Sequence, residues 1–141
     1  ETLRQSRRLR TRAMSNAPKR FDPPGAKFTG MSQAIRTGNF VTVSGQVALK
    51  GGKVVGVGDP KAQAQQCFEN IGAALAEAGA SLADVINLRC YLVGSDSYAG
   101  YGAVKNELFK DNPPCSTAVI ISGLLLPDLL MEVEAVAWKP E

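Results

Sequence analysis

The spacing of apolar and polar positions in the first third of the chain predicts a β-hairpin. Two apolar runs, residues 31–36 and 40–44, are joined by Thr37-Gly38-Asn39, which has the composition of a tight turn. Gly51-Gly52 then reverses the chain, and residues 53–57 fit a short third strand or an extended arm. The folded part of the chain is therefore expected to begin with strands.

An amphipathic helix is predicted to follow these strands. Asp59 is a favourable N-cap, and Pro60 suits the first helical position, where its missing N–H group costs nothing. Gly79 ends the segment. Between them, apolar residues recur at spacings of three and four: Ala64, Cys67, Phe68, Ile71, Leu75 and Ala78.

Residues 85–93 alternate like a strand that buries one face. The expected apolar face consists of Ile86, Leu88, Cys90 and Leu92. The opposite face is mixed and consists of Val85, Asn87, Arg89, Tyr91 and Val93.

A second helix is predicted over residues 98–109, with caps from Ser95-Asp96-Ser97 and an end at residues 111–114, Asp-Asn-Pro-Pro. Its expected stripe is Tyr98, Tyr101, Lys105 and Leu108. Gly100 and Gly102 each cost about 1 kcal/mol relative to alanine inside a helix. Three explanations fit: close approach of another backbone, a widened cleft, or a frayed first turn.

Strands over residues 115–122 and 130–138 complete the chain. The order predicts an α+β fold, in which two helices cover one face of a mixed sheet. In the last strand, Met131, Val133, Ala135 and Ala137 face one way, and Leu130, Glu132, Glu134, Val136 and Trp138 face the other. The uncovered face keeps Tyr91, Val136 and Trp138, which predicts a homo-oligomer.

Charge is distributed unevenly along the chain. The first thirteen residues carry five arginines and one glutamate, whereas eleven basic and twelve acidic residues follow from Met14 onward. We therefore expect a basic, mobile tail over residues 1–20 and one domain over residues 21–141. The tail also fits an organellar presequence, or non-native residues ahead of a start at Met14. The folded domain is not expected to bind nucleic acid.

The chain contains no histidine, which excludes Ser-His-Asp triads, Cys-His dyads and histidine zinc sites. No metal and no cofactor are expected. The three cysteines, Cys67, Cys90 and Cys115, form no Cys-x-x-Cys pair and fit reduced thiols in a cytoplasmic compartment. No apolar stretch approaches the ~20 residues that a membrane-spanning helix needs, so we expect a soluble protein without a membrane partner.

Five short motifs, taken in order, resemble those of the RidA (YjgF) family. They are Gly30-x-x-Gln33-Ala34, Val43-Ser44-Gly45-Gln46, Ala76-x-Ala78-Gly79, Asp84-Val85 and Glu132-x-Glu134-Ala135-x-Ala137. The resemblance covers residues 28–139 and implies a chorismate-mutase-like fold. It also implies a homotrimer with sheets inward, helices outward and clefts between subunits. Deaminases of this family hydrolyse imines and enamines to 2-keto acids and ammonia.

The resemblance implies a set of site residues in such a cleft. Glu132 matches the glutamate that positions or activates water, and Ser44 and Gly45 match the residues that orient the substrate. Glu134 is the competing carboxylate on the same face, and Arg89 is a possible ion-pair partner for either. We interpret Arg89 as structural rather than as a relocated carboxylate clamp.

Three family positions are not retained. Met31 stands where an aromatic residue is expected, Gly102 where an asparagine is expected, and Ser116 where the deaminases have the arginine that binds the substrate carboxylate. Losing that guanidinium removes a contact worth roughly 1.5 to 3 kcal/mol. Cys115, next to Ser116, is a candidate nucleophile or redox site if it lines the cleft.

These residues predict a protein that binds a small imine, enamine or carbonyl compound and hydrolyses it. One alternative is a ligand-binding or protective member without deaminase turnover, because Ser116 replaces the arginine. Another is a tailoring enzyme for an uncharged or larger substrate, because the three replaced positions make the cleft less charged and roomier. The ribonuclease activity described for some members is disfavoured, because the domain lacks a basic face and an aromatic stacking motif.

Overall fold

The computed structural model describes residues 17–141. Its main feature is a six-stranded mixed sheet with the strand order β1-β2-β3-β8-β6-β7, in which only β6 and β7 pair in parallel. The elements are β1 (Lys19–Phe21), β2 (Ala34–Thr37), β3 (Phe40–Val47), β4 (Leu49–Lys50), β5 (Lys53–Val54), α2 (Pro60–Glu77), β6 (Val85–Val93), α3 (Tyr98–Leu108), β7 (Cys115–Ile121) and β8 (Met131–Trp138). Two short 3₁₀ turns, η1 (Leu82–Asp84) and η2 (Ser95–Ser97), precede β6 and α3.

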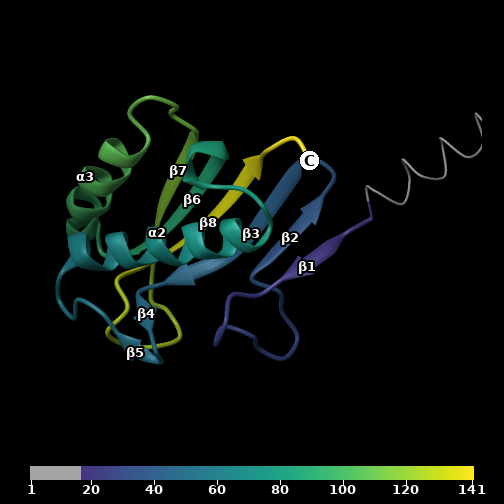
Figure 1. Ribbon diagram of the computed structural model, residues 1–141. Coiled ribbons are helices and arrows are strands. Elements are labelled where there is room, and N and C mark those ends of the chain that lie inside the picture. The colour runs from purple at the N-terminus through teal and green to yellow at the C-terminus, as the bar shows by residue number, and fades with distance from the viewer. Residues whose placement is uncertain (1–16) are drawn as a thin grey trace, which may run out of the picture.

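Both helices lie on the same face of the sheet (Figure 1). The core forms between them and that face, as the alternation in β8 shows: Met131, Val133, Ala135 and Ala137 are buried, whereas the residues between them are only partly so. The α+β prediction and the predicted alternation are therefore confirmed. Among the described residues, no helix combines the length and the apolarity needed to cross a bilayer.

The predicted hairpin forms between β2 and β3. Thr37 pairs with Phe40, so that Gly38 and Asn39 make a two-residue turn, and Gly38 has a φ of 60°. β3 continues to Val47, beyond the predicted end at residue 44. The predicted third strand is shorter than expected, because only Lys53–Val54 pairs, with β4.

Helix α2 begins and ends as the sequence predicts. The Asp59 side chain accepts a hydrogen bond from the Ala62 N–H group at 3.1 Å, and Pro60 is the first helical residue. Gly79 follows the helix with a φ of 79°, a conformation that glycine adopts without strain. The predicted apolar stripe is buried, and two glutamines, Gln63 and Gln66, are buried beside it.

The predicted apolar face of β6 is wrong at its first residue. The pairing of β6 with β8 shifts register between Val85 and Asn87, which is a β-bulge. The bulge turns Val85 into the core, at 3% exposure, and leaves Ile86 outside at 44%. From Leu88 onward the expected alternation holds.

The expected stripe of α3 is also wrong in part. Tyr101 is fully buried, but Tyr98 and Leu108 are exposed, and Val104 takes the second buried position. A β carbon at Gly100 would lie 2.7 Å from the backbone nitrogen of Lys61. Gly100 therefore allows the backbone of helix α2 to approach closely, which is the first of the three explanations given for this glycine. At Gly102 the nearest neighbour of a β carbon would be 3.9 Å away, so no close approach explains that glycine.

The sheet begins earlier than the predicted domain. Lys19 and Arg20 belong to β1, which pairs with β2, so they are not part of a tail. Residues 1–16 of the predicted tail lie outside the described residues. After β1 the chain turns, with a hydrogen bond from the Ala26 N–H group to the Pro23 carbonyl at 3.0 Å.

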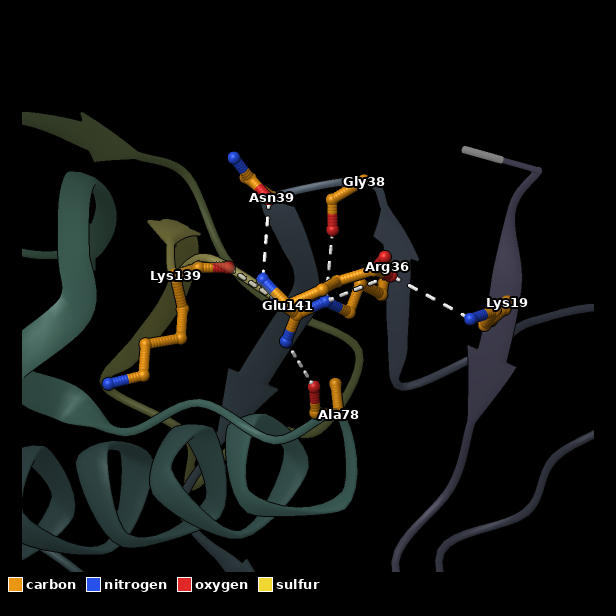
Figure 2. Close-up of polar contacts among 7 residues, drawn as sticks. All are labelled: Lys19, Arg36, Gly38, Asn39, Ala78, Lys139 and Glu141. Atoms are coloured by element: carbon orange, nitrogen blue, oxygen red, sulfur yellow. Dashed lines mark hydrogen bonds and ion pairs between the residues drawn. The ribbon is translucent and has the colours of Figure 1, made fainter. Parts of the chain in front are cut away.

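A buried arginine ties this edge of the sheet to helix α2 and to the end of the chain (Figure 2). Arg36 donates to the carbonyls of Ala78 at 2.7 Å, Gly38 at 3.0 Å and Lys139. Its Nε atom also lies 3.7 Å from a carboxylate oxygen of Glu141. Because the Ala78 carbonyl is an unpaired acceptor at the end of α2, the guanidinium satisfies it and interacts favourably with the helix dipole.

Candidate functional site

A cavity of about 680 Å³ opens at one end of the sheet. Its walls come from the β1–β2 connection, the end of β3, the β4–β5 hairpin, helix α2 and the loop before β8. Most of the lining is apolar and includes Pro23, Phe28, Met31, Leu125, Leu126 and Leu129. A large apolar cavity with a few polar groups is typical of small-molecule binding sites.

Glu132 and Gly45 meet in the wall of this cavity. β3 shifts register against β8 between Val43 and Gln46, and Gly45 lies within this irregular stretch. A β carbon on Gly45 would be 2.2 Å from Oε1 of Glu132 and 2.9 Å from its Cδ atom. The Glu132 carboxylate therefore packs directly against the backbone of Gly45. Any residue larger than glycine at position 45 would place its own side chain where this carboxylate lies.

The environment of Glu132 makes its side chain harder to ionise than a free glutamate. Partial burial, and secondly the nearby negative charge of Glu134, raise the pKa of Glu132 above its usual value. No hydrogen bond or ion pair connects its side chain to another residue within the described range 17–141. A carboxylate with a raised pKa and no protein partner can exchange a proton with a ligand or with water.

Glu134, the competing carboxylate, has a partner. The Tyr91 hydroxyl donates a hydrogen bond to it, and this bond is the main reason that the pKa of Tyr91 is raised. Arg89 lies opposite Glu134 in the β6–β8 register, but in the part of the chain that the structure describes it forms no ion pair. The proposed pairing of Arg89 with either glutamate is therefore wrong in this structure.

Ser44 holds a loop in place and does not line the cavity. Its hydroxyl donates to the Ser32 carbonyl at 2.6 Å, and its N–H group donates to the Gln33 carbonyl at 2.9 Å. These bonds fix the segment before β2 against β3. Its contribution to the site is therefore to position Gly45 and Gln33, which both line the cavity.

The other residues expected in the site are divided between two places. Met31 lines the cavity with Glu132. Arg89, Gly102, Cys115 and Ser116 do not: they lie on β6, α3 and the edge strand β7. Cys115 is exposed, and Ser116 lies opposite Leu88, a core residue, in the parallel β6–β7 register. Within one copy of the chain, the position expected to hold arginine is thus separate from the cavity.

The sequence did not identify the amide side chains that line the cavity. Gln33 is buried; its Nε2 donates to the Ala26 carbonyl at 2.9 Å and its Oε1 accepts from Gln46 at 2.7 Å. Gln46 donates further to the Ser44 carbonyl at 3.0 Å. The only signal in the sequence was that Gln33 and Gln46 stand inside two of the family motifs.

A second pair of amides comes from helix α2. Asn70 donates to the carbonyls of Val47 and Leu49, both at 3.0 Å, and accepts from Gln66 at 2.9 Å. Because backbone carbonyls can only accept, these bonds fix which end of each amide is nitrogen. Gln66 was not detectable, because at about 100° per residue it lies roughly 200° around the helix from Ala64, opposite the predicted apolar stripe.

Among residues 17–141, the cavity lining contains one cation and two carboxylates. The cation, Lys50, lies 3.6 Å from the second carboxylate, Glu69 of helix α2. Both side chains are largely exposed, so this ion pair contributes little to stability. For the site, the consequence is that the positive charge of Lys50 is already neutralised by Glu69.

The face of the sheet away from the helices carries exposed apolar side chains. Ile86, Val119 and Trp138 are between 43% and 45% exposed, and β7 is an edge strand. Such a surface suits contact with another subunit. The homo-oligomer therefore stays a prediction that this surface supports.

A family model described as endoribonuclease L-PSP matches residues 24–139. A RutC family protein of Pyrococcus abyssi is 43% identical over 110 residues, which span 77% of this chain and 85% of the relative. The mitochondrial protein MMF1 of Saccharomyces cerevisiae is 33% identical over 115 residues, 81% of this chain and 78% of the relative.

Solved structures agree with this match. A YjgF/YER057c/UK114 family member from Mycobacterium tuberculosis, 30% identical, covers 86% of this chain and 99% of its own, with a TM-score of 0.75. The structure of yeast Mmf1, 26% identical, covers 87% of this chain and 99% of its own, with a TM-score of 0.79.

Proposed function

We propose that this chain, which belongs to the YjgF/RidA family, hydrolyses small imines or enamines, with Glu132 handling the protons. The observation that carries the proposal is the half-buried Glu132 carboxylate, without a protein partner, on the Gly45 backbone in the wall of a largely apolar cavity. A carboxylate left in this state costs stability unless it serves a ligand.

The reaction needs a group that first accepts a proton and then returns it. As water adds to the imine carbon, Glu132 takes one of its protons, and the electron pair of the C=N bond goes to nitrogen. Glu132 then protonates the nitrogen of the resulting carbinolamine. As the C–N bond breaks and ammonia leaves, the hydroxyl oxygen forms the C=O bond and its proton passes to Glu132, so the carbonyl product remains. The raised pKa of Glu132 supports this double role, because it brings the acid and base forms closer in population at neutral pH.

The test is the rate of imine hydrolysis by purified Glu132→Gln and Glu132→Ala proteins. Each is expected to lose about 100-fold or more in kcat, the usual contribution of a positioned general acid–base group. Glu107→Gln is the matched control, because Glu107 is exposed and pairs only with Lys110. An unchanged rate in both Glu132 variants would refute the proposal.

The second candidate is a ligand-binding or protective protein without turnover, and the observation favouring it is Ser116 at the arginine position. Catalysed release of product at substoichiometric protein concentration would exclude it. RNA cleavage, named in the description of the family model, is disfavoured because Lys50, the cation that residues 17–141 bring to the cavity, is already ion-paired.

We also propose a homotrimer, formed through the sheet face that the helices leave open. The exposed apolar side chains on β6, β7 and β8 support this assembly. Light scattering after size-exclusion chromatography measures the mass directly. For the compartment, we propose the cytoplasm or an organelle; relatives named as mitochondrial support the latter.

A further inference from the structure

From the polar groups of the cavity, we infer that its ligand is a cation, a protonated imine or amine, with an apolar body and no carboxylate. The hydrolysis of such a ligand rests on the function proposed above. Its recognition does not, because it depends only on the charges and hydrogen-bond groups in the cavity wall.

Most side-chain amide N–H groups of the cavity wall already donate within the protein: Gln46 and Asn70 use both, and Gln33 and Gln66 use one each. The side-chain nitrogens of Gln33, Gln46, Gln66 and Asn70 each donate to a protein oxygen at 2.7 to 3.0 Å. A carboxylate ligand needs several such donors to replace its hydration. Among these four side chains, only Gln33 and Gln66 keep a second N–H group, so a carboxylate would find fewer donors here than in water.

The acceptors of the same wall are available. Apart from the Glu132 carboxylate, the side-chain oxygens of Gln46 and Gln66 receive no hydrogen bond from any residue in the range 17–141. Since the amide nitrogens are fixed by their own bonds, these oxygens cannot be exchanged for donors by rotating the amide. The cavity therefore offers oxygen acceptors to a ligand that carries N–H groups.

The charged side chains of the cavity also favour a cationic ligand. Lys50 is matched by Glu69 at 3.6 Å, which leaves Glu132 as the carboxylate of the lining without a counter-ion in the described part of the chain. An anionic ligand would meet this like charge, whereas an iminium or ammonium group would neutralise it. The remaining lining, including Phe28, Met31 and Leu126, would bury the apolar body of the ligand.

For a protonated aldimine the balanced reaction is R–CH=NH₂⁺ + H₂O → R–CHO + NH₄⁺. The C–O bond forms from water, the C–N bond breaks, and no oxidant or reductant is needed. Glu132 is next to the cation in the ground state and receives the water proton as the cationic charge is lost, so the total charge in the cavity stays constant. An imino acid would bring an additional negative charge, for which the lining from residues 17–141 has no unpaired cation.

Recognition is tested by calorimetry with two stable probes of similar size, 2-phenylethylammonium and 3-phenylpropanoate, on the full assembled chain. We expect the ammonium to bind about tenfold or more tightly than the carboxylate, as one charge-assisted contact provides. Glu132→Gln should remove most of this preference. Equal or tighter binding of the carboxylate overturns the inference, and loss of that binding in Lys50→Gln would identify Lys50 as the carboxylate clamp instead.

Turnover is tested with two imines that differ only in the carboxylate. An amine oxidase acting on 2-phenylethylamine generates one, and an L-amino acid oxidase acting on L-phenylalanine generates the other, each in the presence of the protein. Faster hydrolysis of the carboxylate-free imine supports the inference, and faster hydrolysis of the imino acid contradicts it. If neither is accelerated but the ammonium probe binds preferentially, the recognition stands and the proposed hydrolysis fails.

Discussion

Gly45→Ala tests whether the position of the Glu132 carboxylate, and not only its presence, determines activity. The added β carbon would lie 2.2 Å from Oε1 of Glu132, whereas an ordinary contact starts at 3.4 Å. The carboxylate therefore has to move by about 1 Å. A displacement of about 1 Å can cost on the order of 100-fold in rate, because proton transfer requires aligned groups.

The same substitution is expected to leave stability nearly unchanged. The group that moves is the end of a flexible side chain, and Gly45 does not have a positive φ. The smaller entropy of the unfolded chain with alanine offsets part of the remaining cost. We expect the free energy of unfolding to change by less than about 1 kcal/mol.

The assay is steady-state imine hydrolysis, with thermal unfolding of the same preparations. Gly123→Ala is the matched control, because a β carbon there meets no atom within 4 Å. Gly45→Ala should also add little to the loss in Glu132→Gln, since both act through one carboxylate. A Gly45→Ala protein that is folded and retains activity within about threefold of the wild type would refute this reasoning.

Three further predictions concern helix packing, the buried arginine and the pH profile. Gly100→Ala should destabilise the protein by about 1 to 3 kcal/mol through overpacking against α2. Gly102→Ala should stabilise it by about 0.5 to 1 kcal/mol, because its β carbon would make only an ordinary contact with Tyr98 at 3.9 Å. Opposite shifts in Tm check both, and a stable Gly100→Ala protein would contradict the close approach. Arg36→Met should cost about 3 kcal/mol or more in urea unfolding, because three carbonyls lose a charged donor; a cost under about 1 kcal/mol would count against this. Glu134→Gln removes the nearby negative charge that helps to raise the pKa of Glu132, so the acidic limb of the kcat/KM profile should move to lower pH, and an unmoved limb would disprove this coupling.

Features set by local spacing were predictable from the sequence. The Asp59 cap, the apolar stripe of α2 and the alternation in β8 depend on neighbours one to four residues away, so they can be recognised from the local sequence alone. The motifs around Gly45 and Glu132 likewise predicted that both residues belong to one site, and in the structure the two residues are in contact.

Features set by pairing between distant segments were not predictable. The bulge at Val85 exchanges buried and exposed positions because of how β6 meets β8, and no pattern within β6 encodes it. Ser44 and Ser116 were expected in the site from their matched positions, but the hydroxyl of Ser44 bonds to Ser32, and Ser116 lies on an edge strand away from the cavity.

The chemistry of the cavity depends on tertiary structure most of all. The sequence shows glutamines and an asparagine, which can donate or accept equally well. Only the fold brings acceptors against their nitrogens and leaves the side-chain oxygens of Gln46 and Gln66 without a donor from residues 17–141. The sequence by itself determined the family, the arrangement of two helices on one sheet face, and Glu132 as the candidate carboxylate. The contacts between β3, α2 and the loops decided that Glu132 lies in a cavity with free oxygen acceptors. The physical reason is that the hydrogen-bond groups of a side chain are free only where its neighbours leave them unused.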